Sequence, residues 1–399
     1  MSHDPLRWIE PALGELEAVG LRRVLRHRVT PAGPCADGLV NLSSNDYLGL
    51  AGDPRVIDAA RAAAADWGAG SGASRLVTGG TALHCELERV IARWKQTEDA
   101  VVFSSGYLAN AGVIPALVGR GDLVCSDALN HASIIDGCRL SRADVRVYPH
   151  RDLRALDRLL GTGGAGGERR ALVVTDGVFS MDGDAADLPE LCAVAEAHGA
   201  MVMVDDAHGC GVLGPGGRGT AAAAGCADRV HVQMGTLSKA FGAAGGYVAG
   251  TRPLCDWLRN RARGFVFDTA LVPAAAGAAL RALEIAAAEP WRRAHALALA
   301  RRLARGLERH TGACAAEPAA CVVPLVLGEP EAALHASAAL AEAGLLVVAI
   351  RPPSVPPGGA RLRFAVTAAH TEAQIDEAVN AVEHGRRIRR GCAAKGASA

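Results

Sequence analysis

Residues 171–211, ALVVTDGVFSMDGDAADLPELCAVAEAHGAMVMVDDAHGCG, contain the pattern that decides the fold. Short apolar runs at 171–176 and 201–206 flank DLPELCAVAEAHG, which predicts a helix with Asp187 as its N-cap and Gly199 at its end. A strand, a helix and a second strand at this spacing form a βαβ unit, in which the two strands lie parallel in one sheet.

Similar apolar runs continue on both sides of this unit, at 101–104, 123–126, 145–149, 230–235 and 246–250. Helical, Ala-rich stretches precede them at 54–67 and 81–95. Repetition of the βαβ unit implies a mostly parallel sheet with helices on both faces, because each crossover lays a helix against the sheet. The predicted class is therefore α/β.

The regions outside this repeat have other patterns. Residues 6–26 carry apolar positions three or four apart, which predicts an amphipathic helix, and 41–52 is a turn-rich connection. Strands at 322–327, 345–350 and 361–366 with a helix at 330–343 predict a smaller α+β unit. We expect an N-terminal segment (1–50), a large domain (51–280), a small domain (281–385) and a disordered tail (386–399), with a flexible surface loop at 161–167.

Bulk composition excludes several classes of partner. The chain has 42 basic and 42 acidic residues, so it lacks the basic surplus of a nucleic-acid or acidic-membrane binder. It contains no apolar run long enough to span a membrane, and its charged first residues do not form a signal peptide. Eleven cysteines without paired or metal-ligand spacing predict reduced thiols in a cytoplasmic protein with no metal site.

Lysine is rare in this chain. Only Lys95, Lys239 and Lys395 are lysines among the 42 basic residues, so a retained lysine calls for a reason specific to an amine. Lys239 lies in the small-residue segment MGTLSKAFGAAGGYVAG, where a flat molecule could approach the backbone closely, whereas the contexts of the other two predict exposure. The alternative is a surface lysine in a glycine loop.

Two other segments carry side chains that suit an amine-bound aromatic cofactor. Asp205 follows the strand MVMVD, where α/β sheets place ligands, and His208 lies three residues further on. His131 follows another strand, in SDALNHASIIDG. An acid for a pyridine nitrogen, a flat ring and an amine are what pyridoxal phosphate (PLP) requires. The alternatives are a helix-cap or loop acid at Asp205 and a turn-capping histidine at His131.

The phosphate of such a cofactor needs amides or hydroxyls. The segment FSSGYLAN predicts a strand, then Ser105-Gly106-Tyr107, then a helix whose first amides could bind an anion. Thr236 and Ser238 add hydroxyls just before Lys239. The absence of a P-loop motif and of a well-placed dinucleotide fingerprint argues against nucleotide binding.

Together these segments resemble one family, the α-oxoamine synthases of the aspartate-aminotransferase-like PLP enzymes. The matching stretches are NLSSNDYLGL, GSGASRLVTGGTALHCELE, FSSGYLAN, DALNHASIIDG, TDGVFSMDGD, VDDAHGCGVLG and TLSKAFG, over most of residues 40–250. The resemblance implies the PLP-dependent transferase fold of type I, with a mostly parallel sheet in the large domain and a smaller α+β C-terminal domain.

The resemblance also implies a role for each matching residue. Lys239 would form the imine with PLP and act in catalysis with His131, Asp205 and His208, where His131 stacks on the ring, Asp205 pairs with its nitrogen and His208 meets its phenolic oxygen. Further cofactor contacts would come from Gly106, Tyr107, Ser180 and Thr236, and from Thr269 toward the phosphate of a neighbouring subunit in a homodimer with a shared active site. Substrate contacts would come from His131, Asn45 and Arg363 with the amino-acid carboxylate, and from Ser354 with Arg22 or Arg23 at the acyl substrate.

The string AIRPPSVPPGGARLRFAVTAAHT at 349–371 indicates which substrates to expect. It resembles the family member that joins L-alanine to a pimeloyl thioester, carried by CoA or by acyl-carrier protein, with loss of carbon dioxide. Sister enzymes that use glycine or serine with another acyl-CoA fit this string less well. A non-catalytic subunit that keeps the fold is the other alternative, and the presence of Lys239 argues against it.

Overall fold

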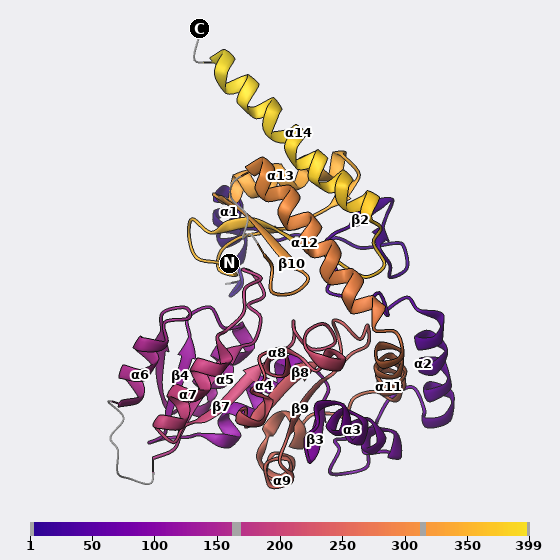
Figure 1. Ribbon diagram of the computed structural model, residues 1–399, viewed down its shortest axis with the longest axis vertical. Helices are drawn as coiled ribbons and strands as arrows, with labels where there is room; N and C mark the ends of the chain where they lie inside the picture. The colour runs from indigo at the N-terminus through magenta and orange to yellow at the C-terminus, as the bar shows by residue number, and fades with distance from the viewer. Residues whose placement is uncertain (1–3, 162–168, 312–316, 397–399) are drawn as a thin grey trace. The chain divides into compact units, whose positions relative to one another are not determined.

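The computed structural model describes residues 4–161, 169–311 and 317–396, with only the backbone for 310–311 and 385–396. The chain divides into two units, a large one at Asn45–Leu297 and a small one made of the described residues before and after it. The expected loop at 161–167 falls outside the described residues from 162 onward. Figure 1 labels the elements of both units.

The large unit contains one seven-stranded sheet in the order β3-β9-β8-β7-β6-β4-β5. Its strands are β3 (Asp99–Phe103), β4 (Leu123–Asp127), β5 (Asp144–Tyr148), β6 (Ala171–Asp176), β7 (Met201–Asp205), β8 (Val232–Thr236) and β9 (Gly246–Gly250). Only β9 runs antiparallel to its neighbours. The seven strands predicted from the apolar runs and the mostly parallel sheet are confirmed.

The helices of this unit lie between or beside the strands. They are α2 (Pro54–Trp67), α3 (Ala82–Lys95), α4 (Gly106–Leu117), α5 (Ala132–Ser141), α6 (Leu153–Gly161), α7 (Leu188–Ala197), α8 (Thr220–Ala223), α9 (Arg252–Arg261), α10 (Arg263–Val266) and α11 (Pro273–Ala288), with short 3₁₀ turns at Pro215–Gly217 and Ala227–Arg229. Helix α7 has the predicted cap, since the Asp187 side chain accepts from the Glu190 amide. Its first turn also holds a proline, which suits a position without an amide partner.

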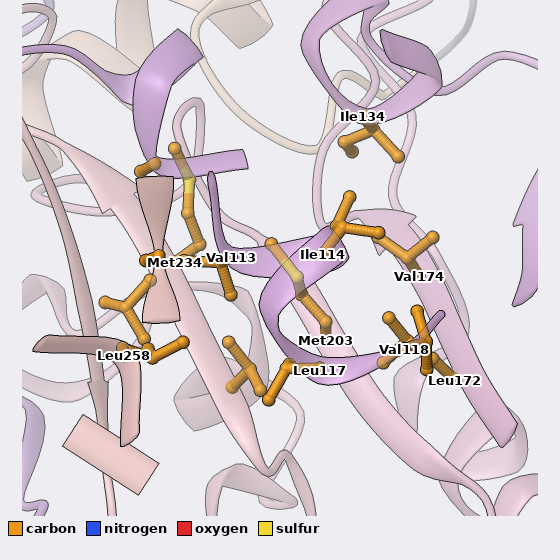
Figure 2. Packing of buried hydrophobic residues seen from close by; sticks show 14 of the residues in the cluster. Val113, Ile114, Leu117, Val118, Ile134, Leu172, Val174, Met203, Met234 and Leu258 are labelled. Carbon is orange, nitrogen blue, oxygen red and sulfur yellow. The ribbon is translucent and has the colours of Figure 1, made fainter. Parts of the chain in front are cut away.

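Both faces of the sheet are buried along six of its seven strands, as the sequence predicts, whereas the edge strand β5 is mostly exposed. Along β6, Leu172 and Val174 pack with Ile114 and Leu117 of α4 on one face, whereas Val173 packs with α6 and α7 on the other. Figure 2 shows the first of these clusters. Alternate side chains of a strand point to opposite faces, so a strand buried on both sides must be apolar throughout. This burial holds the strand ends, and the polar residues on them, in fixed register.

The small unit has two three-stranded sheets, β1-β2-β11 and β10-β13-β12. Its elements are α1 (Ile9–Ala18), β1 (Cys35–Ala36), β2 (Leu39–Asn41), the part of α12 (Trp291–Thr311) from Ala298 on, β10 (Val322–Gly328), α13 (Pro330–Glu342), β11 (Leu345–Leu346), β12 (Ala349–Ile350), β13 (Ala360–Ala365) and α14 (Glu372–Gly396). Apolar residues of α12, α13, α14 and the strands form its core.

Three expectations for the small unit need correction. The helix predicted at 6–26 is shorter, because Gly20 adopts a positive φ of 66° and ends it, so the basic segment Arg22–Arg28 is not helical. The single strand predicted at 345–350 is two short strands that pair in different sheets. The predicted disordered tail instead continues α14 as far as Gly396, and 397–399 lie outside the described residues.

Candidate active site

Polar residues end three neighbouring strands of the large sheet at the same edge. Asp176 ends β6, Asp205 ends β7 and Thr236 ends β8, and the pairing register places Asp176 directly beside Asp205. This is the edge where parallel α/β sheets bind ligands. A cavity of about 210 Å³ opens there, and its walls are formed by Ser105, Gly106, Tyr107, His131, Ser133, Asp176, Ser180, Asp205, Ala207, His208, Met234, Thr236, Ser238 and Lys239.

The predicted amine lies in this cavity. Lys239 is half-buried, and its Nζ lies 2.8 Å from Nε2 of His208. The other ring nitrogen of His208, Nδ1, lies 2.6 Å from the hydroxyl oxygen of Tyr47, which also lies 3.1 Å from Oδ1 of Asn45. Three side chains thus continue from the amine in a hydrogen-bonded series, so the alternative of a plain surface lysine is wrong.

Asp205 is buried, and two hydrogen bonds orient its carboxylate. Its Oδ2 accepts from Nδ2 of Asn110 at 2.6 Å, and its Oδ1 accepts from the backbone amide of Ala207 at 2.9 Å. A buried carboxylate costs free energy unless donors or a cation satisfy it. The two donors fix the plane of the carboxylate at the cavity wall, where a cationic ring nitrogen would be a further partner.

His131 combines both functions considered for it. It is the N-cap of α5, and its own amide donates to Oδ2 of Asp176 at 2.8 Å, yet its ring also lines the cavity. The Ser133 amide lies 3.3 Å from Nδ1, and an amide can only donate, so Nδ1 is the acceptor and the neutral ring carries its proton on Nε2. Burial lowers the pKa of His131, with the positive charge of Lys239 adding to it and Asp205 opposing it.

Sequence reasoning missed three groups that hold these residues in place: Asp176, Asn110 and Tyr47. Burial, and then the negative charge of Asp205 beside it, raise the pKa of Asp176 well above its ordinary value. Asp176 ends its strand as Asp205 does, so the same strand-end rule could have found it. Asn110 and Tyr47 are different, because no local pattern signals a contact made across the fold.

The start of α4 forms part of the cavity wall. Ser105, Gly106 and Tyr107 line it together with the hydroxyls of Thr236 and Ser238, which lie 2.7 Å apart. A Cβ at position 106 would lie 3.1 Å from Met234 Cε, a tight contact that glycine avoids at the start of the helix. Tyr107 is half-exposed and its hydroxyl donates to Asp136. First-turn amides and hydroxyls suit a phosphate.

The side chains and amides of this cavity match the functional groups of PLP one by one. The cavity offers a primary amine for the aldehyde, a carboxylate for the pyridine nitrogen, an imidazole for the ring, and amides with hydroxyls for the phosphate. The fit rests on residues from five separate segments that meet at one edge. Within the described residues, no group of three or more His, Cys, Asp or Glu side chains could hold a metal ion.

The remaining predicted residues are placed outside this cavity's lining. Asn45 belongs to the large unit and accepts from Tyr47, and Thr269 is exposed on the same unit in a β-bridge with Ser74. The other four belong to the small unit. Arg363 is buried on β13, Arg22 pairs with Glu17 at 2.5 Å, and Arg23 lies 3.5 Å from Ser354 Oγ.

Comparison with known proteins agrees with this site. The family model described as aminotransferase class I and II matches residues 37–382. An 8-amino-7-oxononanoate synthase from Anaeromyxobacter dehalogenans is 55% identical over 380 residues, covering 94% of each chain, and one from another Anaeromyxobacter species is 56% identical, covering 97% of this chain and 98% of its own.

A solved structure agrees as well. Serine palmitoyltransferase from S. paucimobilis with bound PLP and myriocin superposes with a TM-score of 0.91 at 32% identity, covering 97% of this chain and 99% of the other. Because the family model and these relatives span nearly the whole chain, the protein belongs to the aminotransferase class I and II family and, within it, to the PLP-dependent α-oxoamine synthases.

Proposed function

We propose that this protein is an 8-amino-7-oxononanoate synthase of biotin biosynthesis, an acyltransferase that condenses L-alanine with a pimeloyl thioester and releases carbon dioxide and the carrier thiol. The observation that carries the proposal is the meeting of Lys239, Asp205, His131 and His208 in one cavity, in a chain more than half identical to proteins of that name.

When bound, PLP supplies an electron sink for the pair left on the α-carbon of an amino acid that loses its proton. Lys239 would hold the cofactor, and its freed Nζ would take that α-proton. His208, whose Nε2 lies 2.8 Å from that Nζ, would meet the phenolic oxygen of the cofactor. Asp205, whose Oδ2 accepts from Asn110, would pair with the ring nitrogen. His131 presents Nε2–H as a donor to the oxyanion that forms on the attacked thioester carbonyl.

Other residues would bind the two substrates. We propose that Asn45 and Arg363 hold the L-alanine carboxylate and that Ser354 with Arg23 contacts the acyl substrate. The 3.5 Å approach of Arg23 to Ser354 supports Arg23 over Arg22, whose charge is paired with Glu17. Ser180 in the cavity lining would contact the cofactor. Exposed Thr269 suits a contact with the phosphate of a second subunit in a homodimer.

The carrier and the cellular location belong to the same proposal. CoA or an acyl-carrier protein would deliver the pimeloyl group, and the enzyme would work in the cytoplasm on small-molecule substrates. No helix among the described residues combines the length and apolar character needed to cross a bilayer.

The test is an assay of the purified holoenzyme with pimeloyl-CoA and, in separate reactions, L-alanine, glycine or L-serine. We expect carbon dioxide release and a product of the mass of 8-amino-7-oxononanoate with L-alanine. Strong preference for glycine or serine would overturn the substrate assignment. Because a serine palmitoyltransferase is a structural neighbour, L-serine with palmitoyl-CoA is a further arm, and turnover there above the alanine reaction would favour that activity instead.

A further inference from the structure

The hydroxyl of Tyr47 contacts His208, a residue of the cavity lining, without lining the cavity itself. Tyr47 is fully buried and His208 nearly so, and their side chains meet through Nδ1 of the histidine at 2.6 Å. The neighbouring turn holds the tyrosine in place, because the Asp46 carboxylate accepts from the amides of Leu50 and Ala51. Tyr47 is therefore a fixed partner for the imidazole that contacts Lys239.

Proton counting allows two arrangements of this series. In the first, the Lys239 ammonium donates to Nε2 of His208, Nδ1–H donates to the Tyr47 oxygen, and the tyrosine hydroxyl donates to Asn45 Oδ1. In the second, the hydroxyl turns and donates to Nδ1, so that Nε2 of the neutral ring carries the proton and becomes a donor. Tyrosine has one proton, so it cannot donate to Asn45 and His208 at once.

We propose that Tyr47 is a positioning residue that sets which nitrogen of His208 carries the proton. His208 would then accept from the Lys239 amine in one arrangement and donate to a cofactor oxygen in the other. A hydroxyl serves both because it donates and accepts, whereas a phenylalanine ring does neither. The proposal deepens the proposed function, since it concerns the same cavity and its cofactor.

Other ionisable groups share the cavity with His208, and any spectroscopic titration must take them into account. Lys239 contacts His208 directly, and Asp176, Asp205 and His131 line the same cavity. None of these is removed by a change at position 47. A shift caused by Tyr47→Phe, which deletes a single oxygen atom, can therefore be assigned to the lost hydrogen bond.

The test is a pH titration of the visible absorption band of holoenzyme carrying Tyr47→Phe. Loss of one hydrogen bond to His208 should move the titration midpoint by about 0.5–1 pH unit. We also expect kcat to fall while KM for L-alanine stays close to that of the wild type. Tyr148→Phe is the matched control, because Tyr148 is an equally buried tyrosine on β5 whose hydroxyl, unlike that of Tyr47, makes no hydrogen bond to His208.

A double-mutant cycle separates positioning from a general structural effect. In a His208→Gln background, Tyr47→Phe should add no further shift, because the group it acts through is gone. Equal shifts in both backgrounds, or a Tyr47→Phe midpoint equal to that of Tyr148→Phe, would overturn the proposal. The titration uses no acyl substrate, so its result is independent of whether the pimeloyl assignment holds.

If Tyr47→Phe does not fold, nitrogen NMR of histidine-labelled wild-type holoenzyme decides the question. The proposal expects His208 to carry its proton on Nε2 when the cofactor is bound. A proton found on Nδ1 in that state would refute it.

Discussion

Lys239 and Lys95 are both retained lysines in a chain whose other basic residues are nearly all arginine, yet their surroundings differ sharply. Lys239 is half-buried in a cavity, with its amine 2.8 Å from the imidazole of His208. Lys95 is only 3% exposed, and its amine donates to the Arg218 carbonyl at 2.5 Å and lies 3.9 Å from Asp206. The expectation that Lys95 is exposed is therefore wrong.

The comparison shows that the scarcity of lysine marks positions that need an amine but does not show whether that amine is catalytic or structural. At Lys95 a compact ammonium lies between the Arg218 carbonyl and the Asp206 carboxylate. Asp206 in turn accepts from the amide and hydroxyl of Thr220 and closes the base of the loop that carries His208. Adjacent aspartates thus separate in role: Asp205 faces the cavity and Asp206 holds the loop.

The largest effect is expected from Lys239→Ala. Losing the amine that holds the cofactor and moves the α-proton should lower kcat by at least about 10³-fold, because proton transfer and covalent attachment are both lost. Mass spectrometry after borohydride reduction should find no cofactor attached to the variant, whereas Lys95→Met should still carry it. Attachment of the cofactor at another lysine would contradict the prediction that Lys239 alone holds it.

Lys95→Met should instead reduce stability. Removing the ammonium leaves the buried Asp206 carboxylate with the Thr220 donors but without its nearby cation, which we expect to cost about 3–5 kcal/mol in the free energy of unfolding measured by urea titration. Arg281→Met is the control, since its exposed ion pair with Glu284 should be worth only about 0–1 kcal/mol. Equal losses in the two variants would show that Lys95 has no special place in the fold.

Asp205→Asn should lower turnover by about 10²-fold or more, because the amide cannot hold a proton on the cofactor ring. Steady-state kinetics and urea unfolding on the same preparation give both readouts. We expect Asp206→Asn to reverse the pattern, with stability altered and kcat within a few-fold of wild type. If Asp206→Asn lost turnover as severely as Asp205→Asn, the division between the two aspartates would fail.

The smallest effect concerns pH. Burial raises the pKa of Asp206 to about 6, so the native state holds this proton more tightly than the unfolded chain. Between pH 4 and 6 the proton held by Asp206 in the native state makes the free energy of unfolding fall as pH rises. Asp206→Asn should remove this slope, which is at most about 1.4 kcal/mol per pH unit.

Asp122 provides a control of opposite sign for this slope. Burial favours a raised pKa there, but donors from Gly119 and Arg170 hold the pKa of Asp122 below its ordinary value. Asp122→Asn should therefore remove a contribution that appears as pH rises. That contribution grows only below about pH 4, so unfolding free energies at about pH 2, 3 and 4 test Asp122→Asn, whereas those at pH 4, 5 and 6 test Asp206→Asn. Slopes that change in the same direction would contradict the assignment.

Much of the large unit was predictable from the sequence. Buried parallel strands are apolar on both faces, so the runs ALVVTD and MVMVD predict strands directly. Because ligands bind at the carboxyl ends of such strands, the position of Asp205 was predictable as well. Short strands and helix ends in the small unit were less predictable. Gly20 ended a helix whose apolar spacing continues beyond it, and the run LLVVAI is divided between two sheets because pairing partners are set by tertiary contacts.

The sequence by itself determined the α/β class and identified Lys239, Asp205, His131 and His208 as candidate site residues, because these depend on local periodicity and position. Only the tertiary structure decided that Lys95 is buried near Asp206, that Asp176 lies beside Asp205, and that Tyr47 and Asn110 contact His208 and Asp205. Those facts depend on contacts between segments far apart in the chain, and such contacts leave no local pattern.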